Sequence, residues 1–198
     1  MTSTFTQKVN KNSRINGKGT LTLSDGTTYE GDFLNGRLHC KNGKVTLPNG
    51  SRYKGGVKYG MFWGNGEIIL ASGDKYVGKF KKGMYWGEGT LYKANDNIYV
   101  GSFERGMIWG KGKYIFASGD TFEGYFDRGM FHGKGQIIYT SGDIYTGDFE
   151  KGMLHGKGKI TYRNGLVKEG TFINDVFQNK KRKSSDEIIV SRKQKMWI

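Results

Sequence analysis

A repeat of 23 residues fills most of this 198-residue chain and constrains its fold more than any other feature. The pattern Tyr-x-Gly-x-Phe returns every 23 residues after a first step of 24, and the pattern Gly-Met-x-Trp/His-Gly-x-Gly follows at the same spacing. A chain with such a period folds as a row of similar units that each contact their neighbours. The copies of the first pattern begin at Tyr29, Tyr53, Tyr76, Tyr99, Phe122, Tyr145 and, in degraded form, Lys168.

Each copy of the repeat predicts a β-hairpin. Over residues 76–80, large rings and glycine alternate with other side chains, which is the period of a strand with two different faces. We expect a turn over residues 81–83 and a second strand over residues 87–92. The predicted fold is therefore all-β: an elongated, single-layer antiparallel meander of hairpins, with no helix between residues 29 and 172.

Composition supports this fold and excludes other glycine-rich classes of protein. Glycine accounts for 33 residues and proline for one, while 14% of the chain is aromatic. Collagen needs a three-residue period with abundant proline, and disordered glycine tracts lack aromatic residues. The recurring glycines share a strand face with the large rings. We therefore expect a thin core in which a ring from a neighbouring strand lies flat over a glycine backbone.

The repeat unit resembles the MORN (membrane occupation and recognition nexus) repeat, whose pattern is Tyr-x-Gly-x-Trp/Phe-x-x-Gly-x-x-His-Gly-x-Gly. The resemblance covers about four-fifths of the chain. It implies a non-enzymatic scaffold of a cytoskeletal or membrane-associated assembly, such as the spoke complexes of the ciliary axoneme. Two copies depart from the pattern. The first has Cys40 within the segment that should read His-Gly-x-Gly, which predicts a local bulge, and the second has Val57 in a ring position.

Charge and composition divide the chain into three parts. The net charge is +14 and is enriched at the two ends. We expect a basic N-terminal extension (1–14), the repeat array (15–177, about seven repeats) and a basic C-terminal tail (178–198). The tail begins with a polybasic run at 180–183, and Ser184 resembles the cap of a short helix. Cys40 is the only cysteine, and no apolar run is long enough to span a membrane. We expect a cytoplasmic protein of the cytoskeleton or cilium, with membrane association left open.

The repeats offer no pattern typical of catalysis. His39, His132 and His155 occupy a repeat position that holds tryptophan in other copies, so that position is structural. The Gly-x-Gly pairs lie within predicted strands, whereas a nucleotide-binding loop precedes a helix. We therefore predict no catalytic residue, no cofactor-binding residue and no metal site, and we predict that the chain is not an enzyme.

Two repeat positions are candidates for binding a partner. Five of the seven methionines share one position, and an apolar residue follows each of them. These side chains either pack along the edge of the sheet or form an apolar groove for a helix or strand of a partner protein. The residues predicted at the centre of that groove are Met84, Tyr85, Met107, Ile108, Met130 and Phe131.

A lysine-rich position in the later repeats is the second candidate. It is either a solvated face or a contact for acidic lipid or acidic protein, and positive charge at this position builds toward the C-terminal half. With the tail, the residues predicted to bind an acidic surface are Lys111, Lys113, Lys134, Lys157, Lys159, Lys180, Lys181, Arg182 and Lys183.

These observations predict a scaffold or adaptor that docks proteins in a cytoskeletal or axonemal assembly. The alternative is an adaptor that binds phosphoinositide or another acidic phospholipid. Nucleic acid is disfavoured as a partner because acidic residues, among them Glu30 and Glu123, interleave with the basic ones. Self-association into a homo-oligomer is left open.

Overall fold

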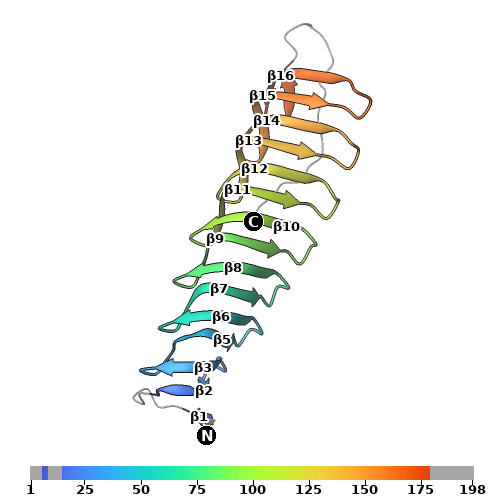
Figure 1. Ribbon diagram of the computed structural model, residues 1–198. Helices are drawn as coiled ribbons and strands as arrows, with labels where there is room; N and C mark the ends of the chain where they lie inside the picture. The colour runs from blue at the N-terminus through green and yellow to red at the C-terminus, as the bar shows by residue number, and fades with distance from the viewer. Residues whose placement is uncertain (1–5, 9–14, 179–198) are drawn as a thin grey trace. The chain divides into compact units, whose positions relative to one another are not determined.

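The computed structural model describes residues 6–8 and 15–178 (Figure 1). These residues form strands and turns, and no helix occurs among them, which confirms the predicted all-β class and the hairpin meander. The chain divides into two compact units, of which unit 1 ends at Asn95 and unit 2 begins at Asp96. The helix and the polybasic run predicted for the C-terminal tail lie outside the described residues.

Unit 1 is a sheet in which strands adjacent in sequence are also adjacent in space. From β2 onward all pairings are antiparallel, and both β4 and β5 pair with β3. The exception is β1, which pairs with β2 in parallel. The strands are β1 (Thr6–Lys8), β2 (Gly17–Thr22), β3 (Thr28–Leu34), β4 (Arg37–Leu38), β5 (Cys40–Thr46), β6 (Arg52–Lys58), β7 (Met61–Ile69), β8 (Lys75–Lys81) and β9 (Met84–Tyr92).

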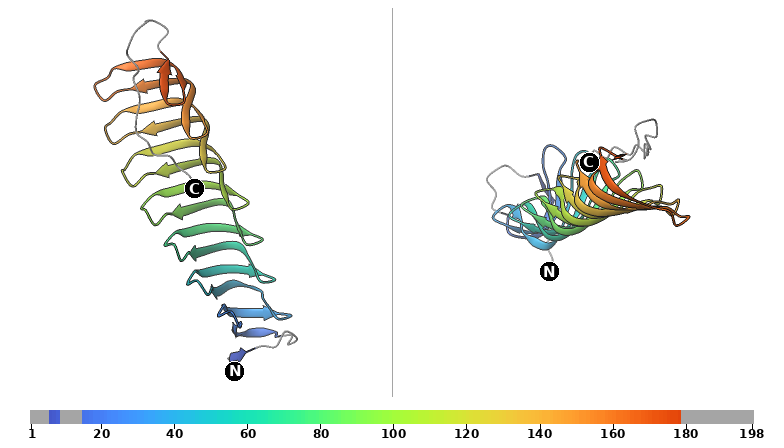
Figure 2. Two further views of the ribbon diagram at one scale, coloured as in Figure 1. Left: turned by 180° about the vertical axis from the view of Figure 1, so that it is seen from behind. Right: turned by 90° about the horizontal axis from the view of Figure 1, so that it is seen from above.

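Unit 2 is an antiparallel meander of the same kind. Successive strands rotate relative to one another within each unit, as in other twisted sheets (Figure 2). The last strand, β17, is short and pairs only with residues 171–173 of β16. The strands are β10 (Ile98–Glu104), β11 (Met107–Ile115), β12 (Thr121–Asp127), β13 (Met130–Ile138), β14 (Ile144–Glu150), β15 (Met153–Thr161), β16 (Val167–Ile173) and β17 (Val176–Gln178).

The second strand of each hairpin is longer than the sequence predicts. In the hairpin β8–β9 the turn consists of Lys82 and Gly83 alone, with φ angles of 53° and 82°. Two successive positive φ angles are typical of the tight turn that matches strand twist. The strand β9 therefore begins at Met84 rather than at Gly87. As a result, the methionine and the residue after it lie within a strand and point to opposite faces.

The first glycine of each Gly-x-Gly pair forms a β-bulge. In β8–β9, Gly78 pairs with Gly89 and Phe80 pairs with Tyr85, so three residues of β9 lie opposite Lys79 alone. Gly87, in the middle of those three, has a φ of 62°, which costs glycine little and other residues more. The pattern Gly-x-Gly thus encodes a bulge and not a ligand-binding loop.

The second glycine of the pair lies beneath an aromatic ring. Tyr76 is fully buried, and a Cβ atom added to Gly89 would lie 2.5 Å from its hydroxyl oxygen. A Cβ atom on Gly78 would meet the same ring. The predicted packing of rings over glycine is confirmed. However, the ring belongs to the strand of Gly78 itself, and the neighbouring strand supplies Tyr85, which stacks on the other side of the ring.

The first hairpin fills this space without a ring. A Cβ atom on Gly31 would lie 2.8 Å from the sulfur of Cys40 and 3.0 Å from a methyl group of Leu38. The register between β5 and β6 shifts between Cys40 and Gly43, which confirms the predicted bulge. Cys40 therefore packs where the other hairpins place an aromatic side chain.

In the last hairpin, a residue from the following strand covers the glycine. Lys168 stands in the position of the tyrosine that covers this glycine in other hairpins, so β16 lacks that ring. Phe177 covers Gly170 instead, because a Cβ atom on Gly170 would lie 2.8 Å from the Phe177 ring. The strand β17 therefore closes the core at the end of unit 2.

Polar side chains connect the turns of successive hairpins. A carboxylate of Asp120 accepts a hydrogen bond of 2.7 Å from the backbone N–H of Thr140, twenty residues later. The sequence predicts that Asp74, Asp120 and Asp143 satisfy backbone groups within their own turns. The structure shows that their carboxylates accept hydrogen bonds from backbone N–H groups of the next turn. The equivalent acceptors are Ser51, Asp74, Asn97, Asp120 and Asp143.

Candidate docking surfaces

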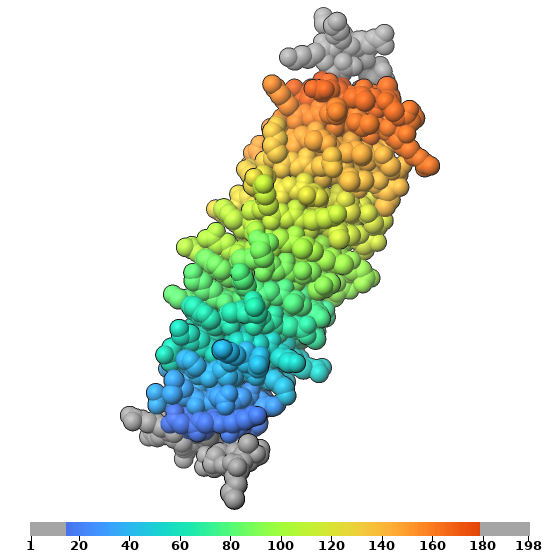
Figure 3. Space-filling view, viewed as in Figure 1, coloured from blue at the N-terminus to red at the C-terminus, as the bar shows by residue number. Residues whose placement is uncertain are grey.

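Each unit has a core face, which carries the rings and the glycines beneath them, and an outer face, which carries the alternate residues. On the core face of β8, Tyr76 and Phe80 are 0% and 3% exposed, whereas Val77 between them is 38% exposed. The outer face is thus a continuous surface of solvent-accessible side chains. In the space-filling view, the side of the described residues that faces the viewer carries no deep cleft within either unit (Figure 3).

The six residues predicted to line a groove lie on opposite faces. The methionines belong to the outer face: Met84 is 41% exposed and Met107 is 45% exposed. Met130 on the same face is half-buried. The residue after each methionine belongs to the core face. Ile108 and Phe131 are only 2% and 6% exposed, so their role is to pack the core.

Tyr85 also belongs to the core face. Its ring stacks on Tyr76 with 3.9 Å between the ring centroids. The methionine position and the position after it therefore do not form one stripe, because strand alternation separates them. A partner on the outer face can touch Met84 in unit 1, and a partner on the outer face of unit 2 can touch Met107 and Met130. The binding of a partner there remains a prediction.

The lysines predicted to bind an acidic surface lie on the outer face of unit 2, among acidic neighbours. Lys134 forms an ion pair of 2.6 Å with Asp148. Lys113 lies opposite Glu123 in the sheet, and Lys159 lies opposite Glu169. Lys111 lies over the ring of Tyr125 at 5.3 Å. The remaining predicted residues of this set, 180–183, lie outside the described residues.

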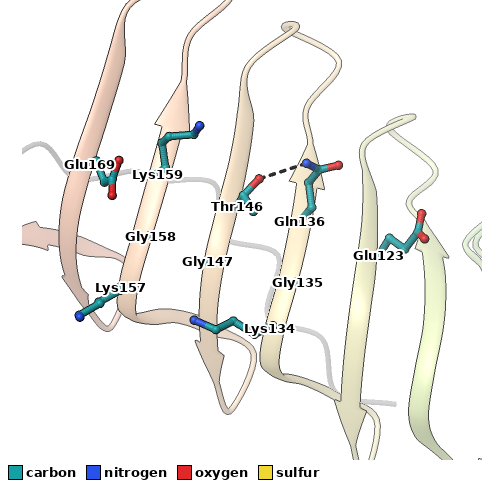
Figure 4. A pocket seen from close by; sticks show the side chains of 10 residues that line it. All are labelled: Glu123, Lys134, Gly135, Gln136, Thr146, Gly147, Lys157, Gly158, Lys159 and Glu169. Atoms are coloured by element: carbon teal, nitrogen blue, oxygen red, sulfur yellow. Dashed lines mark hydrogen bonds between the residues drawn. The ribbon is translucent and has the colours of Figure 1, made fainter.

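Several of these lysines line a shallow, open depression of about 590 Å³ (Figure 4). Gln136 and Thr146 lie in its centre, joined by a hydrogen bond of 3.0 Å. Lysines and glutamates surround them: Figure 4 shows Lys157 and Lys134 at one end and Glu123 at one side. The lining residues are Glu123, Lys134, Gly135, Gln136, Thr146, Gly147, Lys157, Gly158, Lys159 and Glu169.

The excess positive charge of the array lies in unit 1. Residues 15–95 contain 12 Lys and Arg against 6 Asp and Glu, whereas residues 96–178 contain 10 of each. The increase of positive charge toward the C-terminal half is thus a property of the lysine-rich position and not of the array as a whole. The lysine position in the later repeats is balanced by acids at other positions of the same repeats.

The outer face of unit 1 carries a band of aromatic, apolar and basic side chains, most of which are not among the site residues predicted from the sequence. The amino group of Lys81 lies 4.1 Å from the ring centroid of Trp86, and that of Lys58 lies 5.3 Å from the ring of Trp63. Such cation–π contacts hold a charge and an apolar surface together. The repeat position of the tryptophans was visible in the sequence, but its face was not. We call this set the Trp–Met band: Lys58, Met61, Trp63, Lys81, Met84 and Trp86.

The histidines take part in local packing. His39 lies edge-on to the Tyr59 ring with 4.6 Å between centroids, and His155 contacts Asn174. Among residues 6–8 and 15–178, no group of three or more histidine, cysteine or acidic side chains is placed to hold a metal ion. The same part of the chain contains no helix that could cross a membrane.

The sequence profile of the MORN repeat matches residues 11–28, 29–39, 53–75, 76–98, 99–121, 122–144 and 145–167. The chain belongs to the MORN-repeat family. The profile omits residues 40–52, where Cys40 replaces a ring and the register of the sheet shifts. The MORN pattern thus fails where the local packing differs.

Solved structures resemble this MORN-repeat protein only distantly. One is the TCP domain of SAS-4 (dCPAP) of Drosophila melanogaster with a proline-rich motif of Ana2 (dSTIL). It is 15% identical, with a TM-score of 0.39, over 84% of this chain and 97% of that domain. Another is the TCP10 domain of Danio rerio CPAP with a peptide of STIL. It is 13% identical, with a TM-score of 0.22, over 85% of this chain and 97% of the domain. No protein with curated annotation matches the sequence.

Proposed function

We propose that this MORN-repeat protein is a non-enzymatic scaffold that docks proteins within a cytoskeletal or ciliary assembly. The observation that carries the proposal is the outer face, which exposes large apolar side chains in successive repeats of one unit, such as Met61 and Met84 of unit 1. An exposed row of this kind suits a binding surface, because burying it against a partner removes apolar area from water. The cytoskeletal and axonemal part of the proposal rests on membership of the MORN-repeat family.

The sheet suits docking better than catalysis. Its core face is filled by rings that stack over glycine, and its outer face is open and shallow. An enzyme site is usually concave and brings a few polar groups together at one point. A repeated outer face instead presents similar side chains at a regular spacing, which is how repeat proteins bind extended partners.

Affinity purification of the tagged full-length protein from its source cell, with chemical cross-linking and mass spectrometry, tests this function. We expect cytoskeletal or axonemal proteins, with cross-links to lysines of the outer face such as Lys79. Recovery with membrane fragments alone would contradict the proposal. Cross-links that map only to the N- and C-terminal ends would also contradict it.

A second candidate is an adaptor that binds acidic phospholipid. The observation that favours it is the charge of unit 1, where Lys and Arg are twice as frequent as Asp and Glu. Each basic residue near an anionic membrane surface contributes about 1 kcal/mol of binding free energy at most. The four basic residues at 180–183 of the C-terminal tail would therefore give weak, salt-sensitive binding. The test is sedimentation with vesicles that contain a phosphoinositide. If neutralising Lys180, Lys181, Arg182 and Lys183 together leaves binding unchanged, the tail is not the lipid contact, and neutralising Lys58 and Lys81 of unit 1 should then reduce binding.

A further inference from the structure

We propose that the Trp–Met band of unit 1 binds an acidic amphipathic helix of a protein partner. The proposal rests on the scaffold function proposed above and assigns the docking site to one unit and the partner to one chemistry. The tryptophan rings and methionine side chains would contact the apolar side of the helix. The lysines beside them would contact its carboxylates.

The spacing of the Trp–Met band fits a helix. Met61 and Met84 occupy equivalent positions in successive hairpins, which are separated by two strand spacings of about 4.8 Å each, or roughly 10 Å. Residues seven apart on a helix are separated by about 10.5 Å along its axis. A helix that crosses the strands can therefore place one apolar residue per heptad beside each methionine.

The apolar part of the band is accessible. Met61 and Met84 are 43% and 41% exposed, which is high for a residue type that is usually buried. Trp63 and Trp86 are half-buried beside them. Methionine adapts its shape to a partner, and tryptophan contributes a large share of binding energy at interfaces.

The charge of the band selects an acidic partner. Lys58 and Lys81 end the strands β6 and β8 directly opposite Met61 and Met84. Neither of these two lysines forms an ion pair within the described residues, and Lys79, next along the same face, forms none there either. The basic side chains of the band are therefore available for carboxylates of another molecule.

Unit 2 shows that the methionine position alone does not define the site. There, the residue opposite each methionine is acidic: Glu104 faces Met107, and Glu150 faces Met153. A basic residue follows each acid in the turn, and Lys151 lies 3.7 Å from Glu150. The hairpin ends of unit 2 thus carry no excess charge, while those of β6–β9 carry an excess of positive charge.

The proposal can be tested with two designed helical peptides of three heptads. Both carry leucine at the apolar positions, one carries glutamate at the remaining positions, and the other carries lysine. We expect the full-length protein to bind the glutamate peptide and not the lysine peptide, in fluorescence anisotropy at moderate salt. The double variant Lys58→Glu, Lys81→Glu should weaken binding of the glutamate peptide on the order of tenfold, because two attractive contacts become repulsive.

Matched variants in unit 2 control for net charge. Arg105→Glu with Arg128→Glu lowers the net charge of the protein by the same amount at two turns of unit 2 and should not weaken binding of the glutamate peptide. A neutral variant, Met61→Gln with Met84→Gln, should weaken binding while the circular dichroism spectrum and the melting temperature stay unchanged. Equal binding of both peptides, or full binding by Lys58→Glu, Lys81→Glu, would overturn the proposal.

Two further outcomes separate this inference from the scaffold function. If the double lysine variant still recovers the cellular partners, the scaffold function stands and the site assigned here is wrong. If the variant loses binding to phosphatidylserine vesicles and the wild-type protein binds neither peptide, the band contacts a membrane and the proposal fails. If Lys58→Glu, Lys81→Glu loses binding of both the glutamate peptide and the cellular partners, and the control variant in unit 2 does not, the result supports the proposal.

Discussion

The ring of Tyr76 lies between two residues of the next strand: it stacks on Tyr85 at 3.9 Å and covers the backbone of Gly89. Its hydroxyl donates a hydrogen bond of 2.9 Å to the carbonyl oxygen of Lys79, beside the bulge. The side chain of Tyr76 therefore joins Gly89, the second glycine of the Gly-x-Gly pair, to the bulge made by Gly87, the first glycine of that pair. This contact explains why the pattern combines a tyrosine with two glycines at fixed spacing.

Gly89→Ala should destabilise unit 1 because its Cβ atom would overlap the Tyr76 ring. Overpacking of this kind costs about 1–3 kcal/mol, which urea denaturation can measure. Gly83→Asn is the matched control, because a Cβ atom there meets nothing within 4 Å and asparagine tolerates a positive φ. Equal losses in the two variants would show that the ring does not require glycine at position 89.

The stability of the protein should fall at alkaline pH. Burial raises the pKa of Tyr76 from 10.0 to about 12, and it also raises the pKa of Tyr53 and Tyr145. The folded state thus favours the neutral phenol. The contribution of the neutral phenol to the free energy of unfolding is complete below about pH 10, where the tyrosine of the unfolded chain is also neutral. It is lost as the pH rises from about 10 toward 12.

Thermal unfolding between pH 8 and pH 11, about the accessible range for tyrosine titration, tests this dependence. Tyr76→Phe should reduce the alkaline loss, since phenylalanine does not titrate. The chain itself contains Phe122 at the equivalent position, where it stacks on Phe131 at 3.8 Å. A melting temperature that is constant up to the highest pH would contradict the prediction.

Asp120→Ala should weaken the connection between two turns of unit 2. Asp120 is 6% exposed and accepts hydrogen bonds from both the N–H and the hydroxyl of Thr140. Leaving buried donors without an acceptor costs about 1–3 kcal/mol. Asp120→Asn should cost less, because the side-chain oxygen of Asn97 accepts the equivalent hydrogen bond from the backbone N–H of Ala117. Chemical denaturation of both variants provides the test. Equal stabilities of the two variants would contradict the prediction.

Adjacent residues of β11 should respond in opposite ways to mutation. Ile108→Ala should cost about 2–4 kcal/mol, because Ile108 is 2% exposed in the core. Met107→Gln should change the free energy of unfolding by less than about 0.5 kcal/mol, because Met107 is 45% exposed on the outer face. A large loss of stability in Met107→Gln would show that the methionine position belongs to the core.

The 23-residue period determined much of this protein by itself. It predicts the hairpins, the antiparallel meander and the family, because each repeat is a local structure that contacts only its neighbours. It also predicts the irregularity at Cys40, since a break in a repeated pattern marks a change in repeated packing. These properties depend on residues that are close in sequence, which is why the sequence alone reveals them.

The faces and the charges were decided only by the tertiary structure. The two-residue turn at Lys82 extends β9 to Met84, and the bulge at Gly87 then sets which side chains face the rings. One residue of difference in a strand moves a side chain to the opposite face. For this reason Ile108 and Met107 look alike in the sequence but lie in the core and in solvent. Similarly, Lys134 is a free charge in the sequence, whereas the fold pairs it with Asp148 on the next strand.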